Sequence, residues 1–354
     1  PNEVSVDTEL FKSNRLNLRW LYERVLPIIF NRLEIKSVLG AAPHYTQNHD
    51  CGVVSASLGY SYIILMKECL ITNRRHHKRI VDFYSKMDRN AISHIVVYNN
   101  VAKSAISESQ LVPKEKISVL GCIRMDGYIK RINFMPSSRS RPPESRKKVV
   151  LFSFIHGVGL YGWVPAMPPK GGPGFFALFQ QVHQAIALLA AKRQDVEFII
   201  KVKWPGPYPT KEVQECFRAV GKPVSSLTNV EITSDRDAQD LILEADVVVS
   251  FGSTTMLEAA VAGKPVIVPD FAEAAEQTYS EYIQLRQTYE IYDVAATPEH
   301  LSELVEDRLI NKDISDNILR KRINYFNQYV SDCGGGATDR YIEKISEVIR
   351  IHGP

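Results

Sequence analysis

Polar and charged side chains recur in this sequence directly after short apolar runs, or one helical turn beyond them. The positions that could do chemistry are Glu68, Arg124, Asp126, His156, Lys201, Lys203, Ser253, Thr254, Thr255 and Glu258. Apolar runs rich in β-branched residues are typical of strands buried on both faces of a parallel sheet. Because parallel α/β sheets bind ligands at the carboxyl ends of their strands, these positions form one set of candidates.

The stretch from Ala245 to Phe271, ADVVVSFGSTTMLEAAVAGKPVIVPDF, predicts a strand, a tight turn, a helix, a loop and a second strand. Ser253, Thr254 and Thr255 open the predicted helix. A helix N-terminus at the carboxyl end of a parallel strand attracts anions, so we expect a phosphate-bearing ligand there. The alternative is that Ser253 or Thr254 only caps the helix.

Lys201 and Lys203 alternate along a strand predicted over 196–203 and would therefore point to the same face. We expect them to bind a phosphate or an acidic sugar. Alternatively, the strand reaches solvent there and the lysines snorkel. Glu258 lies one turn after Thr254, so its carboxylate could hold a ribose diol. Its alternative roles are to cap the preceding turn or to pair with a lysine.

Asp126 is a candidate catalytic carboxylate, with Arg124 orienting it or binding an anionic substrate. The alternative is a local salt bridge between the two. His156 ends a strand and precedes Gly157, which would let a ligand approach the backbone, although a lone histidine is more often structural. Glu68, after a strand over 60–66, is the remaining catalytic candidate. The acids lack HxxxH or DxD spacing, so no metal site is predicted.

Composition narrows the class of protein. The 354 residues are 45% hydrophobic and 23% charged, with a net charge of +3, which fits a soluble globular protein and argues against a dedicated nucleic-acid binder. The five cysteines form no CxxC pair, and no apolar run reaches the ~18–20 residues of a membrane span. We see no signal peptide, and we expect a cytoplasmic protein.

Strands alternate with helices along the whole chain, which predicts two α/β units with parallel sheets. The polar segment 137–148, SSRSRPPESRKK, is the predicted linker between residues 1–136 and 149–330. Residues 331–354 are predicted to end in a helix. Local patterns also predict a polar loop over 43–50, a short helix over 53–58, a helix over 272–286 and an edge strand near 290–292.

Four segments resemble GT-B-type glycosyltransferases of bacterial surface-polysaccharide assembly. KISVLGCIRMD at 116–126 is similar to a KIxVxGxPRxD segment of that group, and Ala245–Phe271 is similar to its donor motif, ADVVIGFNSTTLLEAxxxGKPVIxPxF. Phe179–Lys203 is similar to the helix and strand before the donor site. Cys333–Arg340 stands where many members end in DGxAxxR.

The resemblance extends to retaining β-Kdo transferases, which use CMP-Kdo. It implies two Rossmann-like domains facing across a cleft, with residues 1–136 as a short acceptor-side domain and 149–330 as the donor domain. The C-terminal helix would pack back on the first domain. It further implies no metal, no cofactor besides the nucleotide-sugar donor, and a double displacement with Asp126 as nucleophile. The acceptor would be a glycan or lipid-linked glycan, with peripheral association at the inner face of the inner membrane through that acceptor.

Other functions on the same fold stay open. They are a UDP-sugar transferase, a UDP-GlcNAc 2-epimerase-like enzyme, a CDP-polyol phosphotransferase, and a non-catalytic module that binds glycan or nucleotide.

Overall fold

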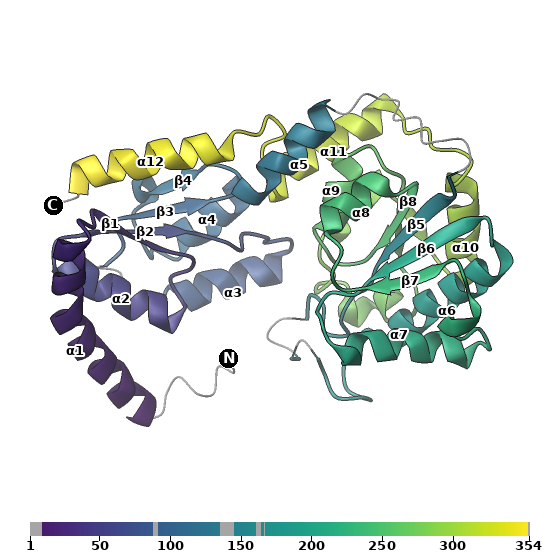
Figure 1. Cartoon of the computed structure of the whole chain (residues 1–354), viewed down its shortest axis with the longest axis horizontal. Helices are drawn as coiled ribbons and strands as arrows, with labels where there is room; N and C mark the ends of the chain where they lie inside the picture. Colours follow the sequence, from purple (N-terminus) through teal and green to yellow (C-terminus); the bar gives the residue numbers. More distant parts are fainter. Residues whose placement is uncertain (1–8, 88–90, 135–144, 161–163, 166, 353–354) are drawn as a thin grey trace. The chain divides into compact units, whose positions relative to one another are not determined.

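The computed structural model describes residues 9–87, 91–134, 145–160, 164–165 and 167–352. These residues form two compact units (Figure 1). Unit 1 consists of the described residues within 1–71, 77–127 and 328–354, and unit 2 of those within 72–76 and 128–327. Apart from the short segment 72–76, the chain passes from unit 1 to unit 2 between Gly127 and Tyr128 and returns between Asn327 and Gln328.

Unit 1 contains a four-stranded parallel sheet, sheet A, in the order β1-β2-β3-β4. Its elements are α1 (Glu9–Arg32), β1 (Ser37–Gly40), α2 (Thr46–Ser57), β2 (Ser61–Leu65), β3 (His94–Val97), α4 (Asn100–Glu108), β4 (Ile117–Val119) and α12 (Ala337–His352). Helices α2 and α4 cover one face of sheet A, and α12 covers the other (Figure 1). Every position of β3 is buried, as its apolar run predicts.

Unit 2 contains a six-stranded parallel sheet, sheet B, in the order β10-β9-β8-β5-β6-β7. Its strands are β5 (Lys147–Phe152), β6 (Val196–Lys201), β7 (Val230–Thr233), β8 (Val247–Ser250), β9 (Val266–Pro269) and β10 (Asp293–Ala295). Its helices are α6 (Phe176–Lys192), α7 (Pro207–Ala219), α8 (Ala238–Glu244), α9 (Thr255–Val261) and α10 (Pro298–Arg308). Helices α6, α7 and α10 lie on one face of the sheet, and α8 and α9 on the other (Figure 1).

Three helices include residues of both units. They are α3 (Arg74–Tyr84), α5 (Ile123–Phe134) and α11 (Asp316–Tyr329).

Strand β5 is central because it pairs with both β6 and β8. Phe152 at its end is level with Lys201 of β6 and Ser250 of β8. The connections from β5 and β6 run outward in one direction, and the chain then crosses back to place β8 on the other side of β5. This reversal of strand order is where open α/β sheets form ligand crevices.

An aromatic cluster supports the carboxyl edge of sheet B. Phe154 follows β5, and its ring centroid lies 5.1 Å from that of Phe251, which follows β8. Phe175 packs 5.0 Å from Phe251, and Phe179 of α6 packs 5.6 Å from Phe154. These four rings are buried. The tilted and edge-on contacts fix the starts of the loops that leave the sheet.

The fold class was predicted correctly: two Rossmann-like units with parallel sheets. Local predictions were wrong in three places. The polar loop over 43–50 and the helix over 53–58 together contain one helix, α2. Residues 272–286 do not form one helix, because short 3₁₀ turns occupy Ala272–Ala275 and Gln277–Tyr279, and a third begins at Arg286. The last strand is Asp293–Ala295 rather than 290–292.

The predicted linker lies partly outside the described residues, from 137 to 144. Its last two residues, Lys147 and Lys148, are the first of β5.

Candidate functional site

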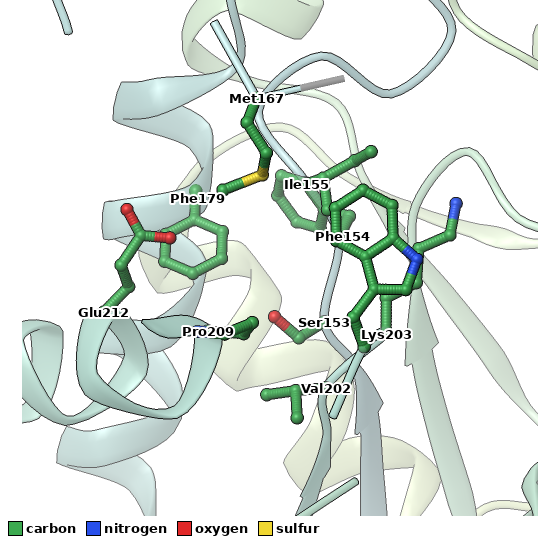
Figure 2. Close-up of a pocket in the computed structure, with 10 residues that line it drawn as sticks. Ser153, Phe154, Ile155, Met167, Phe179, Val202, Lys203, Pro209 and Glu212 are labelled. Atoms are coloured by element: carbon green, nitrogen blue, oxygen red, sulfur yellow. The ribbon is translucent and has the colours of Figure 1, made fainter. Parts of the chain in front are cut away.

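A hollow opens at the carboxyl edge of sheet B, between the residues that follow β5 and β6 (Figure 2). It is a small hollow, partly open to solvent. Its lining comes from two loops, after β5 and after β6, and from helices α6 and α7. The lining residues are Ser153, Phe154, Ile155, Met167, Phe179, Val202, Lys203, Trp204, Pro209 and Glu212.

The hollow is mostly apolar and, besides the indole N–H of Trp204, carries three polar side chains. Ser153 comes directly after β5, Lys203 comes after β6, and Glu212 lies on α7. Figure 2 shows Glu212 and Lys203 on opposite sides of the hollow, with the Ser153 hydroxyl between them. Apolar walls with a few placed polar groups are the usual composition of a small-molecule site.

His156 is buried behind this wall. Its Nε2 lies 3.2 Å from Oε1 of Glu212, and its ring stacks on Phe176 with centroids 4.3 Å apart. The Glu212 carboxylate accepts, so Nε2 carries a hydrogen. Nδ1 of His156 is buried and has no hydrogen-bond partner among the described residues. An unpaired buried polar atom costs about 1–3 kcal/mol, which makes His156 a candidate to gain a partner when a ligand binds.

His183, on α6, is the second histidine beside the hollow. It is fully buried, and its pKa is lowered to about 4: burial is the main cause, the bond to the Phe179 carbonyl opposes the shift, and the nearby His156 adds to it. Nδ1 lies 2.7 Å from the Phe179 carbonyl oxygen, and Nε2 lies 3.0 Å from the Ser153 hydroxyl. His183 therefore stays neutral near pH 7 and is fully hydrogen-bonded.

The predicted phosphate-binding segment, Ser253–Thr255, also lies at this edge, after β8. The helix starts at Thr255, and Thr254 at the N-cap makes no side-chain cap bond. The Thr255 amide donates to the Ser253 hydroxyl at 3.3 Å, and the hydroxyls of Ser250 and Thr255 lie 2.8 Å apart. The turn requires Gly252, whose φ is +59°. The strand-turn-helix order was predicted correctly, and phosphate binding stays a prediction.

The two lysines have different surroundings. Lys201 is the last residue of β6, and its ammonium donates to the carbonyls of Ser234 at 2.5 Å and Val202 at 3.3 Å. It thereby holds the loop after β7. Lys203 lies beyond the strand and lines the hollow, with Nζ 5.8 Å from the Trp204 ring centroid. The expectation that both lysines lie on one strand was wrong, because β6 ends two residues earlier.

Glu258 lies on α9, one turn after Thr254 as predicted, and its amide donates to the Thr254 carbonyl at 2.9 Å. The residue is buried. Its own carbonyl accepts from the Tyr128 hydroxyl at 2.7 Å, which ties the second half of α5 to α9. The ribose contact proposed for its carboxylate stays a prediction.

Asp126 lies in the first turn of α5, in unit 1, and binds the N-terminus of α12. Its Oδ1 accepts from the Ala337 amide at 2.9 Å, and its Oδ2 accepts from the amide and hydroxyl of Thr338, both at 2.7 Å. Burial alone would raise the pKa of Asp126, but these bonds and the Arg340 charge outweigh it and lower the pKa. Asp126 thus caps α12, while its role as nucleophile stays a prediction.

The segments 116–126 and 333–340 meet through these contacts. Arg340 donates to the Leu120 carbonyl at 3.2 and 3.1 Å and to the Gly335 carbonyl at 2.8 Å. Two segments about 210 residues apart, both of which carried the family resemblance, therefore form one structural junction.

Arg124 and Glu68 are exposed and, like Asp126, belong to unit 1. Glu68 follows β2, beside Lys67, whose ammonium lies 4.9 Å from the Tyr45 ring centroid. The other candidates belong to unit 2. Among the described residues, no group of three or more His, Cys, Asp or Glu side chains could hold a metal ion. No helix in that part of the chain is long and apolar enough to cross a membrane.

The sequence reasoning missed Ser153, His183 and Glu212. Ser153 lay inside the strand predicted over 148–154, and it becomes a strand-end residue because β5 ends at Phe152. His183 lies in the apolar segment FALFQQVHQAIALLAAK, where a histidine is ordinarily interpreted as a core residue. Glu212 is one of several polar residues on an amphipathic helix, and no pattern separates it from the others.

No protein-family model matches the sequence, and no curated protein matches it. Solved structures do match the fold. A UDP-GlcNAc 2-epimerase from Neisseria meningitidis, bound to UDP-GlcNAc, is 15% identical with a TM-score of 0.52, covering 95% of this chain and 81% of its own. A glycosyltransferase from Rickettsia africae is 13% identical, with a TM-score of 0.53 and coverages of 99% and 83%. The 2-epimerase from Methanocaldococcus jannaschii is 12% identical, with a TM-score of 0.53 and coverages of 96% and 84%.

The chain therefore has the GT-B-type fold, with two parallel-sheet Rossmann-like units, that this glycosyltransferase and these 2-epimerases share. At these identities the likeness establishes the fold alone.

Replacing Asp126 with alanine should lower the free energy of unfolding by about 1–2 kcal/mol, because α12 loses its N-cap. The control is Asp339→Ala, an exposed acid in the first turn of α12, which should cost less than about 0.5 kcal/mol. Urea unfolding at pH 7 measures both. The gap between wild type and Asp126→Ala should close as the pH falls below about 4, where the carboxylate is protonated. Equal midpoints for both variants would contradict the capping role.

Protonation of His183 should make the protein less stable in mild acid. Its pKa is about 4 in the folded state and about 6.5 when unfolded, so the unfolded state binds more protons between these values. Stability should fall as the pH drops from about 6.5 to about 4 and should not depend on His183 above that range. Unfolding midpoints of wild type and His183→Gln across pH 4–8 test this. Parallel pH profiles for the two proteins would refute it.

Proposed function

We propose that this protein is a glycosyltransferase that takes its sugar from a nucleotide-sugar bound at the carboxyl edge of sheet B. The observation that carries the proposal is the hollow between β5 and β6. It combines an apolar lining with the ammonium of Lys203, and it lies at the same sheet edge as Ser253–Thr255. A nucleotide-sugar needs such a combination, since its rings are flat and partly apolar and its phosphates are anionic.

The roles of the residues follow from their chemistry. Apolar side chains of the hollow, such as Phe179 and Met167, pack against a ring of the ligand. Lys203 neutralises phosphate charge, and the hydroxyls of Ser253–Thr255 donate to phosphate oxygens. Glu258 accepts from ribose hydroxyls. Lys201 acts indirectly, because it holds the loop after β7 in place.

CMP-Kdo is the donor that the sequence resemblance favours, and the sugar would pass to a bacterial surface glycan with retention. Retention by double displacement needs an enzyme carboxylate, and the resemblance assigns that role to Asp126. Its bonds to α12 occupy both carboxylate oxygens. Oδ1 accepts only one hydrogen bond, so it keeps a lone pair that could attack the anomeric carbon while the bonds to α12 stay in place.

A second candidate function is 2-epimerisation of UDP-GlcNAc. The observation that favours it is the buried His156–Glu212 pair, which offers an acid/base group beside the hollow. The Neisseria meningitidis enzyme of the same fold binds UDP-GlcNAc. An epimerase consumes UDP-GlcNAc without any acceptor, whereas a transferase needs one.

A thermal-shift screen with CMP, CDP, UDP and GDP tests the proposal. A nucleotide at 100 times its Kd should stabilise the protein by about 2.7 kcal/mol. Lys203→Ala should weaken the binding of that nucleotide about tenfold, because a charge-assisted contact is lost. The matched control is Lys211→Ala, an exposed lysine of α7 outside the hollow, which should bind as wild type does.

The outcomes separate the candidates. Preference for CMP supports the Kdo donor, and preference for UDP excludes it. Conversion of UDP-GlcNAc to its 2-epimer without an acceptor would show that the protein is an epimerase and not a transferase. Absence of binding by all four nucleotides would refute both enzymes.

A further inference from the structure

Ser153 is the polar residue of the hollow whose hydrogen can be placed from geometry alone. It directly follows β5, and its amide donates to the Lys201 carbonyl at 3.0 Å, which anchors the backbone there. Its hydroxyl oxygen lies 3.0 Å from Nε2 of His183. Which of these two atoms donates the hydrogen decides what Ser153 can offer a ligand.

The tautomer of His183 answers that question. Its Nδ1 lies 2.7 Å from the Phe179 carbonyl oxygen, and a carbonyl can only accept. Nδ1 therefore carries the hydrogen of the neutral ring, and Nε2 is an acceptor. Full burial of His183 favours the neutral ring, so the same arrangement holds across the neutral pH range.

Ser153 must consequently donate its only hydroxyl hydrogen to His183. Its lone pairs remain, and no described residue donates to them. Figure 2 shows the oxygen directed into the hollow, toward the space between Pro209 and Phe179. A group that enters this space meets a hydroxyl that can accept a hydrogen bond but cannot donate one.

The carboxylate of Glu212, which also lines the hollow, is likewise a hydrogen-bond acceptor and not a donor. Glu212 accepts from His156, and an ionised carboxylate has no hydrogen of its own to donate. Two acceptors therefore face the hollow, one from the loop after β5 and one from α7. Lys203 is the one cationic side chain among its lining residues. Phosphate oxygens, which are acceptors and anionic, would be repelled from the Ser153 side.

We propose that Ser153 accepts a hydrogen bond from an O–H or N–H group on an uncharged ring of the ligand, and that phosphate groups are excluded from this position. The inference rests on the proposed function and deepens it, because it orients the nucleotide-sugar in the site. A ring, either nucleoside or sugar, lies against Ser153 and Phe179. The phosphates lie toward Lys203 and the loop after β8.

The Phe179 ring supports this orientation. It lines the hollow, and His156 and His183 both pack against it, with ring centroids 4.8 and 4.1 Å away. An aromatic face next to a fixed acceptor suits a flat ring that carries hydrogen-bond donors. It does not suit a hydrated anion, whose desolvation would be uncompensated there.

Isothermal titration calorimetry with Ser153→Ala tests the proposal. The ligands are a nucleoside, its nucleotide and its nucleotide-sugar: cytidine, CMP and CMP-Kdo, or uridine, UDP and UDP-GlcNAc, whichever series binds wild type. Inorganic pyrophosphate is the probe without a ring. Ser153→Ala should weaken the nucleotide-sugar about tenfold, the effect of one lost hydrogen bond, and leave pyrophosphate unchanged.

The comparison within the series locates the donor group. Equal weakening of nucleoside, nucleotide and nucleotide-sugar would place it on the nucleoside. Weakening of the nucleotide-sugar alone would place it on the sugar. Ser153→Thr keeps the hydroxyl and should restore most of the affinity. Ser225→Ala, at an exposed serine outside the hollow, is the matched control and should bind as wild type does.

Two results would overturn the inference. One is an unchanged affinity of Ser153→Ala for every ring-containing ligand. The other is an equal loss for pyrophosphate, which would show that Ser153 contacts phosphate. If Ser153→Ala fails to fold, Ser153→Thr and Ser153→Cys in the same titrations decide, since the thiol is a much weaker acceptor. Failure of wild type to bind any nucleoside compound would instead refute the proposed function.

Discussion

The pairing of β5 with both β6 and β8 is the constraint on which the candidate site depends. Its register makes the three strands end level with one another, at Phe152, Lys201 and Ser250. Residues that follow these strands must therefore emerge at one edge of sheet B. Aromatic packing between Phe154 and Phe251 then fixes the directions in which two of the loops leave. Polar groups that are about 100 residues apart in the sequence, such as Ser153 and Ser253, therefore lie at the same edge of the sheet.

Buried histidines add a second constraint at the same edge. His183 is satisfied on both ring nitrogens, and its fixed tautomer sets the hydroxyl of Ser153 as an acceptor. His156 is satisfied on one nitrogen only. A fully bonded group can orient its neighbours, whereas an incompletely bonded one gains energy if a ligand supplies the missing partner. His183 is therefore suited to orienting Ser153 toward a ligand. His156 is suited to gaining a hydrogen bond when a ligand binds.

The sequence was most informative where burial alone determines structure. Runs such as Val247–Ser250 are typical of strands buried on both faces, and this run does form the buried strand β8. The rule about strand ends located His156, Lys203 and Ser253. The rule gave no guidance where a residue's role depends on a partner far away in the sequence. Asp126 looks like a free carboxylate in its own segment, but Thr338, 212 residues away, occupies it. Local patterns cannot reveal such a pair.

The helix predicted over 272–286 was wrong for a different reason. Its apolar spacing fits a helix, but Ala272 and Leu285 adopt positive φ values of 49° and 62°, which a helix does not allow. Arg286 instead binds the carboxylate of Asp270 and the Ala274 carbonyl, which fixes the chain in short turns. Tertiary hydrogen bonds here override local propensity.

A crystal structure of the protein with its preferred nucleotide tests the central claim most directly. We expect the nucleotide to occupy the carboxyl edge of sheet B, with a ring within hydrogen-bond distance of Ser153 and its phosphate between Lys203 and the loop after β8. A nucleotide bound elsewhere on the chain, with the hollow between β5 and β6 left unfilled, would contradict it.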